Sequence, residues 1–223
     1  MKTTPSPTIF TRGGHLNAVD LTLARNAVSL GVRVSFQLQP GQRAIVHGPS
    51  GVGKTTLLRT LIGLETPSSG TVTLDERTGA QWTWPTFRSH VIYVHQDNIP
   101  FDGSVWDNLL AAFGYRSRRQ RFEPNYARAV LEALGMDELR QRPARELSGG
   151  QGRRLMLARA LVLKPTYLLI DEPTAGLDAE ASHAVLTSLR RLCTDRVGLL
   201  CATHDPIAVD AIAPSKHVRL HAP

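Results

Sequence analysis

A glycine-rich octapeptide in the first quarter of the chain has the residue types that hold a polyphosphate. It consists of Gly48, Pro49, Ser50, Gly51, Val52, Gly53, Lys54 and Thr55, with Thr56 as a further candidate for nucleotide binding. Glycines let the backbone curl so that several N–H groups point at phosphate oxygens, and a helix beginning near Lys54 would add its positive dipole end. In such loops the lysine reaches the β- and γ-phosphates and the Thr55 hydroxyl ligates Mg²⁺. A chance glycine-rich turn is the alternative interpretation.

Two adjacent carboxylates follow the apolar run 167–170, which predicts a strand buried on both faces of a parallel sheet. Ligands of open α/β sheets bind at the carboxyl ends of strands. Asp171 is therefore placed to hold Mg²⁺, and Glu172 to polarise an attacking water as a general base. A strand that ends in Asp-Glu is ordinary by itself, so the catalytic interpretation depends on the phosphate loop. That loop alone does not separate ATPases, GTPases and small-molecule kinases.

A second glycine-rich segment decides between these classes. Its sequence is Leu147-Ser148-Gly149-Gly150-Gln151, and a helical pattern follows it. Two glycines and a serine at such a junction make a second anion-binding helix N-terminus, although an ordinary helix start capped by Ser148 would look the same. The order of the phosphate loop, this segment and the acidic strand end closely resembles the ATP-binding cassette (ABC) domains. The resemblance covers roughly residues 19–221.

The resemblance implies roles for further residues. Gln96 matches the family's Q-loop glutamine, which senses Mg²⁺ and the transport partner, and Asp178 closes a segment that resembles the D-loop. His204 matches the switch histidine that contacts the γ-phosphate, although a lone histidine after a strand is more often structural. The implied catalytic set is Glu172, His204, Lys54 and Gln96; the metal set is Thr55, Gln96 and Asp171; and further nucleotide contacts come from Ser148, Gly149, Gly150, Gln151 and Asp178.

Two departures from the family pattern stand out. The family usually stacks adenine on an aromatic side chain ahead of the phosphate loop, but residues 21–30 hold no aromatic residue. Arg25 is the nearest candidate by spacing; it could stack its planar guanidinium on the base or be an ordinary surface arginine. The second departure is Gly152-Arg153-Arg154, where the family more often has a polar or charged residue, then Gln, then Arg. Gly152 weakens the helix slightly but removes no predicted phosphate contact.

Strands that alternate with helices predict an α/β fold of the P-loop NTPase type. A mainly parallel central sheet is expected, with an antiparallel β subdomain and a small helical subdomain. The predicted strands are residues 19–23, 33–38, 43–47, 71–74, 90–95, 167–170, 197–203 and 217–221, and the predicted helices are 54–62, 126–134, 149–164 and about 181–192. Residues 1–17 are expected to be a flexible leader and 18–223 a single ABC ATPase domain, with the helical subdomain inserted at about 97–146.

Composition narrows the possible partners. The formal net charge is +7, and arginines cluster at 116–121 and 140–145. Nucleic acid or anionic lipid is one interpretation of this charge; a solvated surface that favours phosphate ligands is the other. No basic block is interleaved with aromatic residues, so no nucleic acid partner is expected. The only cysteines, Cys193 and Cys201, are expected to be buried structural residues. No apolar run approaches the roughly 20 residues of a membrane span, and the N-terminus lacks the features of a secretory signal.

The resemblance implies an ATP-binding and ATP-hydrolysing subunit that powers a membrane transporter, with ATP and Mg²⁺ as cofactors. Two ATP molecules would lie between the phosphate loop of one cassette and the signature segment of a second, in an expected homodimer. A separate transmembrane permease would be the other partner. It would contact the groove near Gln96 and the following segment 97–110, and it would hold the chain peripherally at the cytoplasmic face of the inner membrane.

Export is the expected direction of transport. Residues 101–109 resemble a stretch of exporters and of compact stand-alone cassettes linked to iron or metal-stress export, and the chain length fits that compact group. A generic amphipathic helix start, with Val105, Leu109 and Ala112 as its core face, explains the same stretch. An importer subunit and a soluble assembly ATPase stay open as alternatives. DNA-maintenance cassettes carry long coiled coils and translation-factor cassettes are normally paired in one chain, and neither feature is found here.

Overall fold

The computed structural model describes residues 14–97, 100–114, 121–193 and 196–221. Its centre is a five-stranded sheet in the order β6-β7-β8-β3-β9, and every neighbouring pair of strands is parallel. The strands are β3 (Arg43–His47), β6 (Val91–Val94), β7 (Tyr167–Asp171), β8 (Gly198–Ala202) and β9 (Lys216–Arg219). All residues of β7 and β8 are buried, as expected for strands covered on both faces.

A second, antiparallel sheet lies beside the first, in the order β2-β1-β4-β5. Its strands are β1 (Leu16–Arg25), β2 (Val28–Leu38), β4 (Ser69–Leu74) and β5 (Arg77–Thr78). Leu16 is fully buried and pairs with Leu38 and Leu74. The predicted leader therefore extends too far, because Leu16 and Asn17 already belong to β1; residues 1–13 lie outside the described part of the chain.

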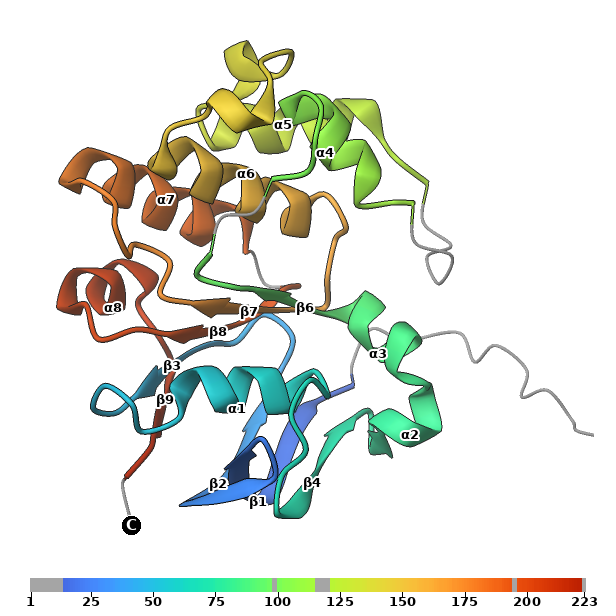
Figure 1. Ribbon diagram of the computed structural model, residues 1–223, viewed down its shortest axis with the longest axis vertical. Coiled ribbons are helices and arrows are strands. Elements are labelled where there is room, and N and C mark those ends of the chain that lie inside the picture. The colour runs from blue at the N-terminus through green and yellow to red at the C-terminus, as the bar shows by residue number, and fades with distance from the viewer. Residues whose placement is uncertain (1–13, 98–99, 115–120, 194–195, 222–223) are drawn as a thin grey trace, which may run out of the picture.

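Helices cover both faces of the parallel sheet (Figure 1). On one face lie α1 (Lys54–Leu61), α2 (Gly79–Trp82) and α3 (Trp84–His90), together with the antiparallel sheet; on the other lie α4 (Val105–Ala111), α5 (Pro124–Ala133), α6 (Gly149–Leu161), α7 (Ala179–Leu192) and α8 (Pro206–Ile212). Alternate residues of β8 enter the two cores: Leu199 and Cys201 pack under the α6 layer, and Leu200 and Ala202 pack against the α1 side. The α/β fold predicted from the sequence is confirmed.

The segment predicted as a helical subdomain holds α4, α5 and two short 3-10 turns, η1 (Asp137–Leu139) and η2 (Ala144–Glu146). Val105, Leu109 and Ala112 form the buried face of the segment that begins at α4, with at most 6% exposure. Buried residues of α5 join the same core as α6 and α7. The division of the chain into domains stays a prediction.

Some elements had no sequence prediction. Residues 79–82 and 84–90 form two short helices, and Trp84, the first residue of the second, fills the space beside Gly63 and Gly79, where an added Cβ would lie 2.4 Å from the ring. Helix α8 was not predicted either. These three helices have only four to seven residues each, with a proline or a turn beside them, and so short a segment shows too few periods of a helical pattern. Within the described residues, every helix is too short or too polar to cross a lipid bilayer.

The cysteine and arginine predictions are met where the structure describes those residues. Cys193 and Cys201 are both buried and free, and burial raises the pKa of the Cys193 thiol to about 12. In the second arginine cluster, Arg140 is paired with Asp137 at 3.0 Å and Arg142 with Glu146 at 3.9 Å. These ion pairs fit a solvated surface. Of the first cluster, residues 116–120 lie outside the described part of the chain.

Candidate nucleotide site

Parallel strands bring the candidate residues to one edge of the sheet. Asp171 is the last residue of β7 and pairs with Ala202, the last residue of β8. Val46 of β3 pairs with the same alanine from the other side. The phosphate loop after β3, the two carboxylates of β7 and the segment after β8 therefore begin at the same level. This is the edge at which open α/β sheets bind ligands.

The phosphate loop has a backbone that only glycine adopts easily at three of its positions, Gly48, Gly51 and Gly53. Gly48 and Gly53 have φ values of 153° and 112°, in the region that disfavours residues with a Cβ. A Cβ on Gly48 would also lie 2.7 Å from Val52 Cγ1. Gly53 is the N-cap of α1 and provides no side-chain cap, so the first N–H groups of the helix stay available to an anion. Thr56, the further candidate for nucleotide binding, is the third residue of α1 and is buried there.

Lys54 lies folded over this loop. Its Nζ donates hydrogen bonds to the carbonyl oxygens of Gly48 at 2.9 Å and Pro49 at 3.1 Å. The curl is thus held around the ammonium group before any phosphate binds. A positive charge beside a glycine-rich loop at a helix N-terminus is the arrangement that suits a polyphosphate.

The two carboxylates of the β7 end point to different partners. Asp171 is 1% exposed, and its Oδ2 accepts hydrogen bonds from the Thr55 hydroxyl at 2.6 Å and the Tyr93 hydroxyl at 3.2 Å. Burial raises the pKa of Tyr93, and the charge of Asp171 raises it further, so the phenol stays a donor. The predicted metal ligands Thr55 and Asp171 therefore lie in direct contact, with oxygen atoms of the kind Mg²⁺ prefers.

Glu172 turns away from this pair toward the end of β8. Its Oε1 lies 2.8 Å from His204 Nδ1, and its Oε2 accepts a hydrogen bond from the Thr203 hydroxyl at 3.1 Å. The side chain of Glu172 is 15% exposed and that of His204 is 78% exposed. The backbone of Glu172 has a left-handed φ of 47°. The structure thus joins the predicted base and the predicted switch histidine directly.

The signature segment is an N-terminal helix cap within its own chain. Ser148 Oγ accepts a hydrogen bond from the Gln151 N–H at 3.3 Å, and the Gln151 side chain accepts one from the Ser148 N–H at 3.0 Å. Gly149 and Gly150 open α6, and a Cβ on Gly150 would touch Leu177, just before Asp178. Asp178 in turn caps α7 by accepting from the Ala181 N–H at 2.7 Å. In these bonds between described residues the Ser148 hydroxyl acts as an acceptor, and a hydroxyl can also donate its proton to a ligand.

The structure does not bring every predicted residue together. Helix α6, with the signature segment at its start, and helix α1, with the phosphate loop at its start, lie on opposite faces of the sheet (Figure 1). Gln96 is exposed after β6 and, among the described residues, has no hydrogen bond to Thr55 or Asp171. The predicted site is therefore divided, with one part at the sheet edge and the other part at the start of α6.

Sequence reasoning missed three residues at this edge. Tyr93 and Thr203 bond the two carboxylates, and each lies within three positions of a predicted site residue on a predicted strand. Arg153 is only 1% exposed and donates to backbone carbonyls around the same carboxylates. Its position among arginines in a helical pattern gave no sign of burial, because charged side chains are almost never buried without a partner.

The β1–β2 hairpin lies against the phosphate loop where a base would be expected. A Cβ on Gly53 would lie 3.2 Å from Leu30 and 3.4 Å from Leu23. The hairpin tip is exposed, and Asn26 and Ala27 there have positive φ values. Arg25 pairs with Val28 at the end of β1. No aromatic residue stands on this tip, which therefore lacks the ring on which the family pattern would stack the base.

We expect this site to discriminate weakly between nucleotide bases. Stacking of a base on an aromatic ring contributes about 1–3 kcal/mol, and the tip that would supply the ring carries none. Affinity then comes mainly from the triphosphate, which ATP and GTP share. The KM values for the two nucleotides should therefore agree within about fivefold, which corresponds to a difference of about 1 kcal/mol in binding free energy. Steady-state hydrolysis of both nucleotides by the purified chain measures this. A KM for ATP more than tenfold below that for GTP would contradict it.

Comparison with known proteins agrees with this geometry. A family model described as "ABC transporter" matches residues 32–175. The phosphonates import ATP-binding protein PhnC of Hyphomonas neptunium is 40% identical over 183 residues, which are 77% of this chain and 70% of that protein. The cytochrome c biogenesis ATP-binding export protein CcmA of Ruegeria pomeroyi is 36% identical over 200 residues, 88% of each chain. The structure of cbiO1 from Clostridium perfringens, part of the ABC transporter complex cbiONQ, superposes with a TM-score of 0.76 at 25% identity, over 92% of this chain and 86% of that one.

The family model covers more than half of the chain, and both relatives exceed 30% identity over more than two thirds of it. Both are ATP-binding proteins by name, one of an import and one of an export system. The phosphate loop leads into α1, Ser148 of the signature segment caps α6, and the two carboxylates stand at the end of β7. This chain belongs to the ABC transporter family, as an ATP-binding and ATP-hydrolysing subunit.

Proposed function

We propose that this chain converts ATP hydrolysis into the movement of a separate membrane permease. The observation that carries the proposal is the pair of contacts at one sheet edge: Thr55 Oγ1 to Asp171 Oδ2 at 2.6 Å, and Glu172 Oε1 to His204 Nδ1 at 2.8 Å. One carboxylate faces the phosphate loop and the other faces a histidine. This separation supports a role for Asp171 in binding Mg²⁺ and a role for Glu172 in accepting a proton.

Each side chain has a distinct role in this proposal. Lys54 leaves the carbonyls of Gly48 and Pro49 and donates to the β- and γ-phosphates. Glu172 accepts a proton from the attacking water. The water oxygen adds to the γ-phosphorus as the bond from that phosphorus to the β–γ bridging oxygen breaks, and ADP and inorganic phosphate leave. His204 holds the Glu172 carboxylate in position and contacts the γ-phosphate. The thirteen-residue helix α6 presents the signature segment to a second nucleotide.

The residues fit a magnesium ion. Thr55 and Asp171 contribute a hydroxyl and a buried carboxylate in mutual contact, and Gln96 would complete the set by moving in from its exposed position. When bound, Mg²⁺ neutralises charge on the β- and γ-phosphate oxygens. Tyr93 donates to the same Asp171 oxygen and so helps to hold that carboxylate in its orientation toward Thr55.

A second cassette is needed to complete the site. Because the signature segment and the phosphate loop lie on opposite faces of one sheet (Figure 1), one chain cannot apply both to the same nucleotide. In a head-to-tail homodimer each phosphate loop would face the signature segment of the other copy. Ser148 would donate its hydroxyl proton and Gly150 its N–H group to the γ-phosphate, while Asp178 lies at the dimer contact beside them.

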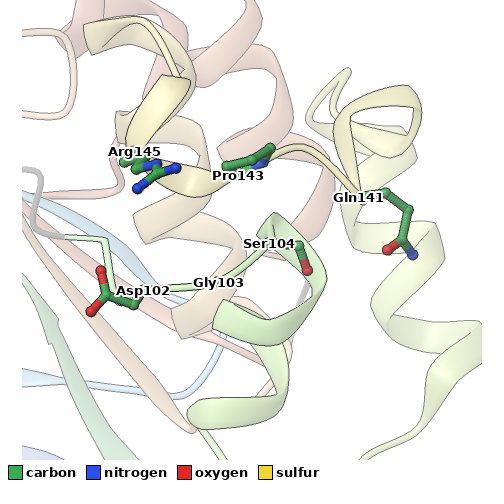
Figure 2. Close-up of a pocket in the computed structure, with 6 residues that line it drawn as sticks. All are labelled: Asp102, Gly103, Ser104, Gln141, Pro143 and Arg145. Atoms are coloured by element: carbon green, nitrogen blue, oxygen red, sulfur yellow. The ribbon is translucent and has the colours of Figure 1, made fainter.

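A groove beside α4 is the proposed contact for the permease. It has a volume of about 510 Å³ and is lined by Asp102, Gly103, Ser104, Gln141, Pro143 and Arg145 (Figure 2). Its walls are joined through backbone hydrogen bonds, Val105 N to Arg142 O at 3.0 Å and Ala144 N to Gly103 O at 2.9 Å. Among these lining residues, Asp102 carries a negative charge and Arg145 a positive charge. These features suit a short polar segment of a partner that docks into a preformed groove.

Export stays the proposed direction of transport. The stretch that forms α4 resembles exporters, and the CcmA relative, matched over 88% of each chain, carries an export name; the PhnC relative carries an import name. Attachment to the permease would hold the chain peripherally at the cytoplasmic face of the membrane. ATP-driven accumulation of substrate in inverted vesicles would support export, and accumulation in right-side-out vesicles would support import.

Co-purification from solubilised membranes tests the central proposal. The tagged chain should retain a polytopic membrane protein, and Arg145→Glu in the groove should remove it while leaving ATP hydrolysis by the isolated chain within twofold. Arg128→Glu, an exposed change on α5 outside the groove, is the matched control and should retain the partner. Recovery of soluble assembly proteins alone, or ATP hydrolysis stimulated by nucleic acid, would contradict coupling to transport.

A further inference from the structure

Arg153 is the largest of the fully buried side chains and lies in α6 just after the signature segment. Its guanidinium donates to four backbone carbonyls. Nη1 bonds His95 at 2.7 Å, Nε bonds Pro173 at 3.3 Å, and Nη2 bonds Asp171 and Glu172. A buried guanidinium is stable only when it is paired or hydrogen-bonded, and this one meets that need almost wholly with carbonyl oxygens.

Those carbonyls belong to separate parts of the proposed site. His95 precedes Gln96, Asp171 ends β7 and Glu172 follows it, and Pro173 starts the segment that leads to Asp178. Arg153 itself is in the helix that begins at the signature segment. One side chain thus joins the backbone next to Gln96, the backbone that bears both carboxylates, and the start of the segment leading to Asp178 to the helix that would serve the other nucleotide.

The hydrogen bonds from Arg153 to Asp171 and Glu172 lie at a stretch of backbone with an unfavourable conformation. Glu172 has a φ of 47°, a conformation that a non-glycine residue keeps only when its surroundings determine it. Arg153 holds the carbonyls of Asp171 and Glu172, and the Glu172 N–H donates to the Ala202 carbonyl at 2.8 Å. These hydrogen bonds fix the direction in which the Glu172 side chain points, toward Thr203 and His204.

Glutamine, the more usual family residue at this position, could not make these contacts. Its amide offers two N–H donors on one nitrogen, whereas arginine offers five in a planar fork. Lysine would keep the charge but donates from a single atom. Geometry therefore makes the four-carbonyl link specific to the arginine of this chain.

We propose that Arg153 is a positioning residue that orients Glu172 for proton transfer and couples this orientation to the signature helix. Resting on the proposed function, this extends it: the state of the nucleotide at one site would pass through Arg153 to the signature segment that serves the other. Replacement of Arg153 should then lower turnover and the cooperativity between the two sites, with little effect on nucleotide binding.

The test is steady-state ATP hydrolysis by the purified chain with Arg153→Gln and Arg153→Lys. We expect kcat to fall about tenfold or more in both variants, the KM for ATP to stay within about threefold, and the Hill coefficient to fall toward one. Arg154→Gln is the matched control. It removes the neighbouring arginine of the same helix, whose Nη1 donates to the Leu134 carbonyl at 3.1 Å, away from the carboxylates, and it should leave kcat and the Hill coefficient within twofold of the unchanged chain.

The outcomes separate this role from a structural one and from failure of the proposed function. Wild-type kcat and Hill coefficient in Arg153→Gln would overturn the positioning role, and so would an equal loss in Arg154→Gln. If both Arg153 variants failed to fold, as measured by thermal unfolding with and without ATP, Arg153 would be a folding residue and the proposal would also be overturned. An unchanged chain without ATP hydrolysis, or an active Glu172→Gln variant, would instead contradict the proposed function itself.

Discussion

Glu172→Gln should bind ATP normally and hydrolyse it about 10²–10⁴-fold more slowly, the range by which a positioned general base accelerates a reaction. The amide has nearly the shape of the carboxylate, whose two oxygens lie 3.1 Å from the Thr203 hydroxyl and 2.8 Å from His204 Nδ1. The glutamine side chain therefore still reaches both residues. It cannot accept the proton of an attacking water. The measurements are kcat from phosphate release and the dissociation constant for a fluorescent ATP analogue.

Glu132→Gln is the control for this change, because Glu132 is exposed on α5, a helix that lies away from the parallel sheet in Figure 1. Its kcat should equal that of the unchanged chain. Near-normal hydrolysis by Glu172→Gln would show that another group accepts the proton. A loss of nucleotide binding in the same variant would place Glu172 in the binding site and not in the chemical step.

Lys54→Ala should weaken nucleotide binding by about 10–100-fold. A hydrogen bond from a charged group contributes about 1.5–3 kcal/mol, and about 1.4 kcal/mol corresponds to a tenfold change in affinity. The alanine also removes the bonds from Lys54 Nζ to Gly48 and Pro49 that hold the loop curled before a ligand binds. Equilibrium binding of ATP and hydrolysis at saturating ATP measure the two losses separately.

Lys164→Ala is the matched lysine control, since Lys164 pairs with Glu123 at 2.7 Å and lies over Tyr126 at the surface. ATP affinity should be unchanged in that variant. A dissociation constant for Lys54→Ala within twofold of the unchanged chain would mean that the phosphate loop binds through its backbone alone.

Sequence patterns predicted the parts of the fold that depend on local chemistry. The run 167–170 is continuous and apolar because β7 is covered on both faces, and the helix at 54–61 ends before Gly63, whose φ of 66° suits the position after a helix. The short helices at 79–90 could not be predicted in this way. They depend on Trp84, which packs against Gly63 and Gly79 from different elements, and such a contact has no local pattern.

The candidate site was predicted where residue type and spacing determine it. Lys54, Thr55 and Asp171 follow directly from the glycine pattern and the strand end, and the structure brings Thr55 and Asp171 into contact. Arg153 was seen only as a departure from a pattern, because its four acceptors are backbone carbonyls and no sequence shows where those carbonyls will point. The completion of the site by a second chain came from family resemblance and not from the residues themselves.

The left-handed backbone of Glu172 has a consequence for natural variation. Glycine would relieve about 1 kcal/mol at such a position, so the fold would tolerate a change at Glu172 that turnover would not. Mutants that lose activity here should accumulate in the cell as folded, nucleotide-binding subunits. In the proposed homodimer, a cell with both forms would pair inactive copies with active ones, and we expect the inactive allele to be dominant over the normal one.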